Sequence, residues 1–335
     1  LALKRYPYLP LQMYWSALAQ WLSLASGVSF VKIVRLLPIA ADMGIALLLL
    51  KGVQRLTGSR QAGLLGGLLY ACNPVSLLVS AYHGQVDSVP ALFVLLAWYT
   101  WLSGKTGPGR LLGSAFWMGM AILVKSWPVL LLPILVLQVS SWRKRLLYLA
   151  ISGAVSLGAI LVYLVVFSGD PSLLLRRVLS YNHGIGIYGY TYLIKVASMW
   201  IVPWSVFEWI VANGRYVTLV VLTAVFLFKA RHEPAHLGLL TILVTFFACT
   251  HAFSIQYLVW IVPFGLLAQQ HKWLAWYTLG AMLYMLLAYM TLVLDGHVTQ
   301  LLPWPQVEPH LIIVAGLPVW LVAVRWMRQR LFESR

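Results

Sequence analysis

Apolar residues dominate the chain in long runs, which are separated by short breaks rich in Gly, Pro, Lys and Arg. About eleven of these runs approach the length of roughly 20 residues with which an α-helix crosses a bilayer. They cover residues 33–50, 62–81, 88–103, 111–124, 127–140, 146–167, 214–229, 236–250, 255–269, 273–294 and 309–325. The pattern predicts an all-α, polytopic bundle of transmembrane helices, in which 111–140 is also compatible with a broken pair.

Two stretches depart from this pattern and are expected at the membrane surface. Residues 8–24 are amphipathic and are interrupted by Trp15, Gln20 and Trp21, which favours a helix at the outer interface. Residues 168–213 are rich in Gly, Tyr and Trp, which favours an interfacial helix and a mobile loop over another span. No internal repeat or linker is evident, so residues 1–335 are expected to form a single membrane-embedded domain.

Composition and charge exclude a water-soluble globule. The 335 residues are 61% apolar and 10% charged, against about 25% charged in a typical soluble domain. The 24 Lys and Arg outnumber 8 Asp and Glu, and this excess indicates basic cytoplasmic loops rather than nucleic-acid binding. Basic clusters fall at every second junction, which is predicted to be cytoplasmic: Lys51/Arg55/Arg60, Lys105/Arg110, Arg143/Lys144/Arg145, Lys229/Arg231, His271/Lys272 and Arg325/Arg328/Arg330.

The polar stretch from His83 to Asp87 stands at a junction predicted to be extracytoplasmic. An ionisable side chain at membrane depth costs about 2.5–3.5 kcal/mol, so it usually pairs, faces water or takes part in chemistry. We interpret Asp87 and His83 as candidate catalytic residues and Gln85 as a candidate substrate contact. The alternative is helix capping, because Asp87 precedes Ser88-Val89-Pro90.

Cations on the outer side are candidates for binding an anionic group. Lys125 ends an apolar run, and Arg176 and Arg177 lie in the long outer loop, against the positive-inside trend. Such side chains bind phosphate well, whereas the alternative for Lys125 is snorkelling to the interface. Further candidate substrate contacts are His183, Gln256 and Tyr257.

The remaining polar and small residues indicate structure. Asp42 lies inside a span, two helical turns after Arg35, which favours internal pairing over catalysis. Cys72 and Cys249 sit in apolar runs without a Cys/His cluster, and no His, Asp or Glu spacing demands a metal or other cofactor. The glycines at 63, 66 and 67 indicate close helix packing.

Five stretches, in this order, resemble landmark motifs of the GT-C glycosyltransferases. The resemblance extends to the GPI mannosyltransferase I catalytic subunit, the glucosyltransferases of N-glycan assembly and related prokaryotic enzymes. It runs from about Tyr6 to Pro263 and rests on Tyr6-Pro7-Tyr8-Leu9-Pro10-Leu11, Asn73-Pro74, His83-Gly84-Gln85-Val86-Asp87-Ser88, Lys125-Ser126-Trp127-Pro128 with Pro133, and Gln256-Tyr257-Leu258-Val259-Trp260.

The resemblance implies a GT-C fold and transfer of a sugar from a polyprenyl-phosphate carrier, typically with inversion, at the outer or luminal face. In that family a first transmembrane helix and a loop with a catalytic carboxylate precede the stretch matched by residues 6–11. We therefore expect these parts, and the general base, upstream of Leu1. Some relatives use a divalent metal, for which this sequence offers no support.

Together these features predict a hexosyltransferase, resembling a mannosyltransferase, whose acceptor is a lipid-linked glycan or another acceptor. A prokaryotic plasma membrane is favoured over the endoplasmic reticulum, and nucleic acid is not expected as a partner. The alternative is a transporter or flippase of a lipid-linked saccharide. Transporters often show two related halves with paired broken helices, and this sequence shows no such symmetry.

Overall fold

The computed structural model describes residues 9–103, 107–172, 184–292 and 309–333. These residues are almost entirely helical, as the apolar pattern predicts, apart from connecting turns and an isolated bridge between Ile185 and Ala252. The chain divides into two compact units. Unit 1 comprises the described residues up to 72 and from 79 to 172, and unit 2 comprises residues 73–78 and those from 184 onward. Each unit is described separately.

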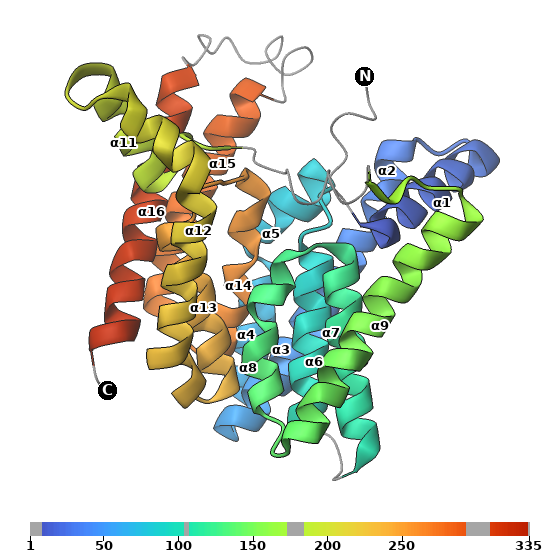
Figure 1. Cartoon of the computed structure of the whole chain (residues 1–335). Coiled ribbons are helices and arrows are strands. Elements are labelled where there is room, and N and C mark those ends of the chain that lie inside the picture. The colour runs from blue at the N-terminus through green and yellow to red at the C-terminus, as the bar shows by residue number, and fades with distance from the viewer. Residues whose placement is uncertain (1–8, 104–106, 173–183, 293–308, 334–335) are drawn as a thin grey trace. The chain divides into compact units, whose positions relative to one another are not determined.

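Unit 1 is a helical bundle, whose helices are drawn in blue to green in Figure 1. Helix α3 packs against α4 and α6, α6 packs against α7, and α7 packs against α9. The elements of this unit are α1 (Pro10–Ser26), α2 (Phe30–Val34), α3 (Leu36–Thr57), α4 (Arg60–Ala71), most of the π-helix η2 (Leu77–His83), α6 (Ser88–Ser103), α7 (Pro108–Val124), η3 (Trp127–Leu130), α8 (Leu132–Leu137) and α9 (Trp142–Val166).

Glycines bring the backbones of α3 and α4 together, as their spacing predicted. A Cβ on Gly63 would meet the carbonyl oxygen of Leu50, and one on Gly67 would lie 2.9 Å from the carbonyl oxygen of Ala46. Small residues at such crossings allow close van der Waals packing, which holds helices together where the hydrophobic effect is weak.

Basic residues from two of the predicted cytoplasmic junctions meet at one end of unit 1. Arg55 lies over the ring of Tyr99 at 5.2 Å, and Arg110 lies over the ring of Trp101 at 4.2 Å, so these basic residues meet at the C-terminal end of α6. Asp87 precedes the N-terminal end of this 16-residue helix, about 24 Å away at 1.5 Å per residue. The assignment of these ends to sides of the membrane stays a prediction.

Unit 2 is a second helical bundle with an aromatic core. Phe253 is fully buried, stacks on Tyr188 with ring centroids 3.8 Å apart, and contacts Phe247 and Tyr284. Its elements are α5 (Pro74–Ser76), α11 (Gly189–Trp200), α12 (Trp204–Phe228), η4 (Ala230–His232), α13 (Ala235–Cys249), η5 (Ile255–Val259), α14 (Ile261–Leu267), α15 (His271–Leu292) and α16 (Pro309–Phe332).

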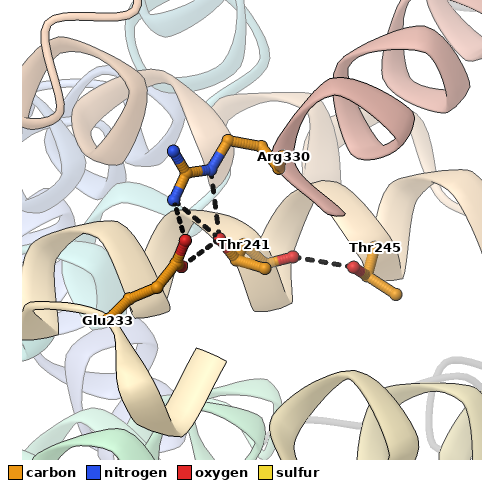
Figure 2. A network of polar contacts seen from close by, with 4 residues as sticks. All are labelled: Glu233, Thr241, Thr245 and Arg330. Atoms are coloured by element: carbon orange, nitrogen blue, oxygen red, sulfur yellow. Dashed lines mark hydrogen bonds and ion pairs between the residues drawn. The ribbon is translucent and has the colours of Figure 1, made fainter. Parts of the chain in front are cut away.

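A buried ion pair ties the end of α16 to α13 and the turn before it (Figure 2). Arg330 Nη2 lies 2.5 Å from Glu233 Oε1, and both side chains are largely buried. The Thr241 hydroxyl donates to Glu233 Oε2 at 2.6 Å and accepts from the Arg330 guanidinium at 3.1 and 3.2 Å. The pair joins two of the basic junctions that the sequence placed on the cytoplasmic side.

Several element boundaries differ from the sequence prediction. Helix α12 begins at Trp204, ten residues before the predicted span. The prediction began the span too late because the first turns of the helix contain Trp and Glu, which interrupt the apolar pattern. The run 127–140 is broken into η3 and α8, which supports the broken-pair alternative. Residues 184–188, predicted as mobile loop, include the bridge to Ala252 and lead into α11.

Four helical stretches in the described part of the chain are long and apolar enough to cross a membrane. They are Phe30–Thr57, Arg60–His83, Trp142–Val166 and Trp204–His232, and four shorter apolar helices accompany them. The amphipathic N-terminal segment is helical as predicted, from Pro10 to Ser26. Its position at the interface and the number of eleven spans stay predictions.

If the Glu233–Arg330 ion pair stabilises unit 2, single and double substitutions of the two residues should change the melting temperature differently. Arg330→Met and Glu233→Met should each lower the melting temperature of the detergent-solubilised protein strongly, because either change leaves a buried charge unpaired at a cost of about 3–5 kcal/mol. The double variant should recover most of the loss, because no uncompensated charge remains. Arg328→Met, at an exposed position on the same helix, is the control; an equal loss there would contradict a role for the pair.

The charge asymmetry of unit 1 predicts its orientation in the membrane. In a variant whose native cysteines are replaced, Tyr82→Cys and Gly109→Cys place exposed thiols at opposite ends of the unit. An impermeant thiol reagent should label position 82 in intact cells and position 109 only after permeabilisation, because basic junctions remain inside. The reverse result would invert the topology.

Candidate functional site

The polar stretch predicted from the sequence follows a π-helical turn. Residues 77–83 form η2, and the backbone N–H of Gln85 donates to the Val79 carbonyl at 3.0 Å, just after this π-helical turn ends. Gly84 has φ = 76°, a left-handed conformation that favours glycine. Single π-helical turns are rare and are found frequently at functional sites. This turn delivers the chain to Asp87 at the start of α6.

Asp87 forms an ion pair with Lys125. Lys125 Nζ lies 2.7 Å from Asp87 Oδ2, and the two side chains are 12% and 0% exposed. Lys125 is extended after the end of α7, and buried Trp127 and Pro128 follow it. Burying an ionised carboxylate costs free energy unless a cation and hydrogen bonds compensate the charge. Because α7 ends just before Lys125, the Lys125 side chain reaches Asp87 and compensates it.

His83 and Gln85 lie beside this pair. Gln85 Nε2 lies 3.3 Å from His83 Nε2 and donates to it in the imidazole tautomer that leaves this ring nitrogen unprotonated. His83 interacts electrostatically with Asp87, Lys125 and Arg35. The structure therefore brings together four of the predicted site residues, all within unit 1.

Arg35 is a member of this cluster that sequence reasoning did not assign to the site. Its side chain crosses Gly84, where a Cβ would lie 3.0 Å from Arg35 Cγ. Its Nε is buried, and no acceptor reaches it within the part of the chain that the structure describes. A signal was present in the sequence, because Arg35 stands with Lys32 at a junction predicted to be outer, against the positive-inside trend that singled out Arg176 and Arg177.

The charges of the cluster do not cancel. Arg35 and Lys125 are cationic and Asp87 is anionic, so with a neutral imidazole at His83 the cluster carries one net positive charge. A partly buried cation excess favours an anionic ligand, since the interaction is screened less than it is at the surface.

Asp42 pairs internally, although with a different partner from the one its spacing suggested. Its Oδ1 accepts a hydrogen bond of 2.7 Å from the Tyr70 hydroxyl on α4. Arg35 occupies the N-cap position of α3 without a side-chain capping bond, and its side chain lies over Gly84 instead.

The predicted residues of unit 2 lie in its aromatic core. Gln256 is buried and its Oε1 accepts from the Ser254 hydroxyl at 2.6 Å. Tyr257 stacks on Trp260, with ring centroids 4.1 Å apart. Nearby, burial and the charge of Arg215 lower the pKa of His251 from its ordinary 6.5, which favours a neutral imidazole at pH 7. Arg176, Arg177 and His183 lie outside the described residues.

No group of three or more His, Cys, Asp or Glu side chains among the described residues is placed to hold a metal ion. The cluster around Asp87 holds one carboxylate and one imidazole with two cations, which suits an anion better than a metal.

Comparison with protein families gives a match for the first part of the chain. The family model described as dolichyl-phosphate-mannose-protein mannosyltransferase matches residues 13–169, just under half of the sequence. The matched residues run from α1 to the end of α9 and include every member of the Asp87 cluster.

No curated protein and no solved structure matched the chain significantly. Over unit 1 the chain is therefore similar to this mannosyltransferase family, and the described residues form an all-α fold with membrane-capable helices.

Proposed function

We propose that this protein transfers a hexose from a polyprenyl-phosphate carrier to a lipid-linked glycan or another acceptor, at the extracytoplasmic membrane face. The observation that carries the proposal is the buried Asp87–Lys125 pair with Arg35 and His83 beside it, inside the region that the family model matches. The family's printed name makes dolichyl-phosphate-mannose the class of donor to test first.

The charge of the cluster suits such a donor. A polyprenyl-phosphate sugar is a phosphodiester with one negative charge, and the cluster offers one net positive charge. When the bond from the sugar to the phosphate breaks, the leaving phosphate gains charge and reaches about −1.5 to −2 as a monoester. Fixed cations that meet charge as it develops stabilise the transition state more than the ground state.

Within this proposal the residues have different tasks. Lys125 and Arg35 bind the carrier phosphate, joined by Arg176 and Arg177. Asp87 has no exposed surface and positions Lys125. His83 and Gln85 contact sugar or acceptor hydroxyls.

The chemical step is a displacement at the anomeric carbon. The acceptor oxygen forms the new glycosidic bond while the bond to the phosphate oxygen breaks, and the acceptor proton passes to a base. Because phosphate is already a good leaving group, activation of the acceptor matters more than a general acid. We propose inversion and no metal requirement.

Neutralising the pair tests the site without leaving a buried charge. In Asp87→Asn/Lys125→Gln both charges disappear and polar side chains remain, so the protein should fold. Turnover with a polyprenyl-phosphate hexose should fall about 100-fold, the scale of electrostatic contributions to catalysis. Assays use purified protein and a panel of donors.

The matched control is Glu233→Gln/Arg330→Gln, which neutralises the buried ion pair of unit 2. It should keep turnover within about twofold of the unmodified protein, although it removes the same number of charges. Full turnover in Asp87→Asn/Lys125→Gln would contradict the proposed site. A flippase would move the lipid-linked sugar without forming a glycosidic bond with any donor.

We expect the Arg35 side chain to strengthen binding of the donor. Arg35→Gln should raise KM for the polyprenyl-phosphate sugar about tenfold or more, because a hydrogen bond to a charged group contributes about 1.5–3 kcal/mol. Lys32→Gln, at an exposed position one helical turn earlier, is the control and should leave KM unchanged. An unchanged donor KM in the Arg35 variant would remove this side chain from the site.

A further inference from the structure

Gln12 is a buried polar side chain that the proposed site does not yet use. It lies in the first turn of α1, within unit 1, and is 9% exposed. Its carbonyl oxygen Oε1 is buried and has no hydrogen-bond donor among the residues that the structure describes. Burying such a group without a partner costs free energy, so each case in a folded protein calls for an explanation.

The face of α1 that carries Gln12 is turned toward the other helices of unit 1. Gln12, Trp15 and Ala19 stand at spacings of three and four residues, which places them on one face of the helix. Ala19 is fully buried. Trp15 Nε1 donates a hydrogen bond of 2.9 Å to the carbonyl of Val34, the residue before Arg35. This face of α1 therefore contacts the backbone beside Arg35.

The first turn of α1 also contacts the segments that carry the ion pair. Leu11 packs against the apolar cluster that contains Val86 and Val124. Val86 precedes Asp87 in the chain, and Val124 precedes Lys125. Helix α1 packs against α7, which ends at Val124. The first turn of α1 thus lies among the segments that carry the charged cluster.

The chemistry of Gln12 and Arg35 is complementary. A carboxamide oxygen accepts hydrogen bonds and cannot donate them, so its partner must be a donor such as a hydroxyl group. A phosphodiester offers only acceptors, and it matches Arg35 Nε, a buried donor without an acceptor among the described residues. In a polyprenyl-phosphate hexose the sugar is bonded directly to the phosphate. A ligand of this class therefore brings both missing partners together.

We propose that Gln12 recognises the sugar of the donor: its Oε1 accepts a hydrogen bond from one hydroxyl of the hexose, next to the phosphate on Arg35. The inference rests on the proposed transferase function and makes Gln12 a residue that sets sugar specificity. A site that hydrogen-bonds a substrate hydroxyl rejects the analogue that lacks it, because the buried polar group of the protein is then left unpaired.

Deoxy donors test the contact. The unmodified protein is assayed with the polyprenyl-phosphate hexose that it uses and with analogues that each lack one sugar hydroxyl. One analogue should lose about tenfold or more in kcat/KM. In Gln12→Met, which keeps the length of the side chain without its carbonyl, that loss should shrink to about twofold or less. The losses for the other analogues should stay the same.

The matched control is Gln20→Met, the same change at an exposed position on the same helix. It should leave the ratio of kcat/KM between each analogue and the parent donor unchanged. Gln12→Asn keeps an amide but withdraws the carbonyl by one methylene group, and it should lose the discrimination as Gln12→Met does. An unchanged loss for every analogue in both Gln12 variants overturns the proposal. A higher KM for the acceptor alone also overturns it, because the contact would then be with the acceptor.

The stability of the ligand-free protein separates a ligand contact from a structural role. Gln12→Met should give a melting temperature equal to or above that of the unmodified protein, because it removes a buried acceptor that lacks a donor. A lower melting temperature would mean that the amide serves the fold, and would overturn the proposal.

This inference and the proposed function fail in distinguishable ways. If the protein binds donors but transfers none, the transferase function fails. The rise in melting temperature that each deoxy analogue produces, compared with the parent donor, then decides the hydroxyl contact without turnover. If no donor raises the melting temperature of the unmodified protein, the hydroxyl contact is overturned as well.

Discussion

A carboxylate without exposed surface needs a cation within reach, and for Asp87 that cation is Lys125. Removing either charge alone would leave the other buried, at a cost of about 3–5 kcal/mol. The requirement fixes where α7 ends and where α6 begins, because the two helices must place these side chains 2.7 Å apart. Helix α6 also packs against α7 in unit 1.

The second buried pair shows why burial alone does not indicate function. Glu233 and Arg330 are also enclosed, but a threonine hydroxyl links their charged groups and their charges cancel. At Lys125 a second cation, Arg35, stands near the same imidazole and leaves a net charge. The difference in charge balance separates a pair that closes a helix end from a cluster suited to an anion.

The sequence predicted the helical class and the members of the cluster better than their contacts. Asp87 and Lys125 were evident because charges are rare in this chain, but their pairing spans 38 residues and depends on which helix ends meet. Asp42 was assigned to Arg35 from helical spacing, whereas Tyr70 on the neighbouring helix is its partner. Likewise, the sequence prediction placed the start of α12 too late, because Trp204, Glu208 and Trp209 precede its most apolar part.

The same short segments of the chain contribute both the charged residues of the site and the apolar residues packed beside them. Ala41, Val86 and Val124 pack together, and the next residue along the chain in each case is charged: Asp42, Asp87 and Lys125. Neighbouring side chains point in different directions from the backbone, so one set of segments can build an apolar cluster and a charged cluster side by side. The apolar cluster excludes water from one side of the ion pair, which strengthens its attraction. The π-helical turn at residues 77–83 and the left-handed backbone of Gly84 are uncommon conformations. Contacts with the surrounding residues hold the backbone in them and offset their energetic cost.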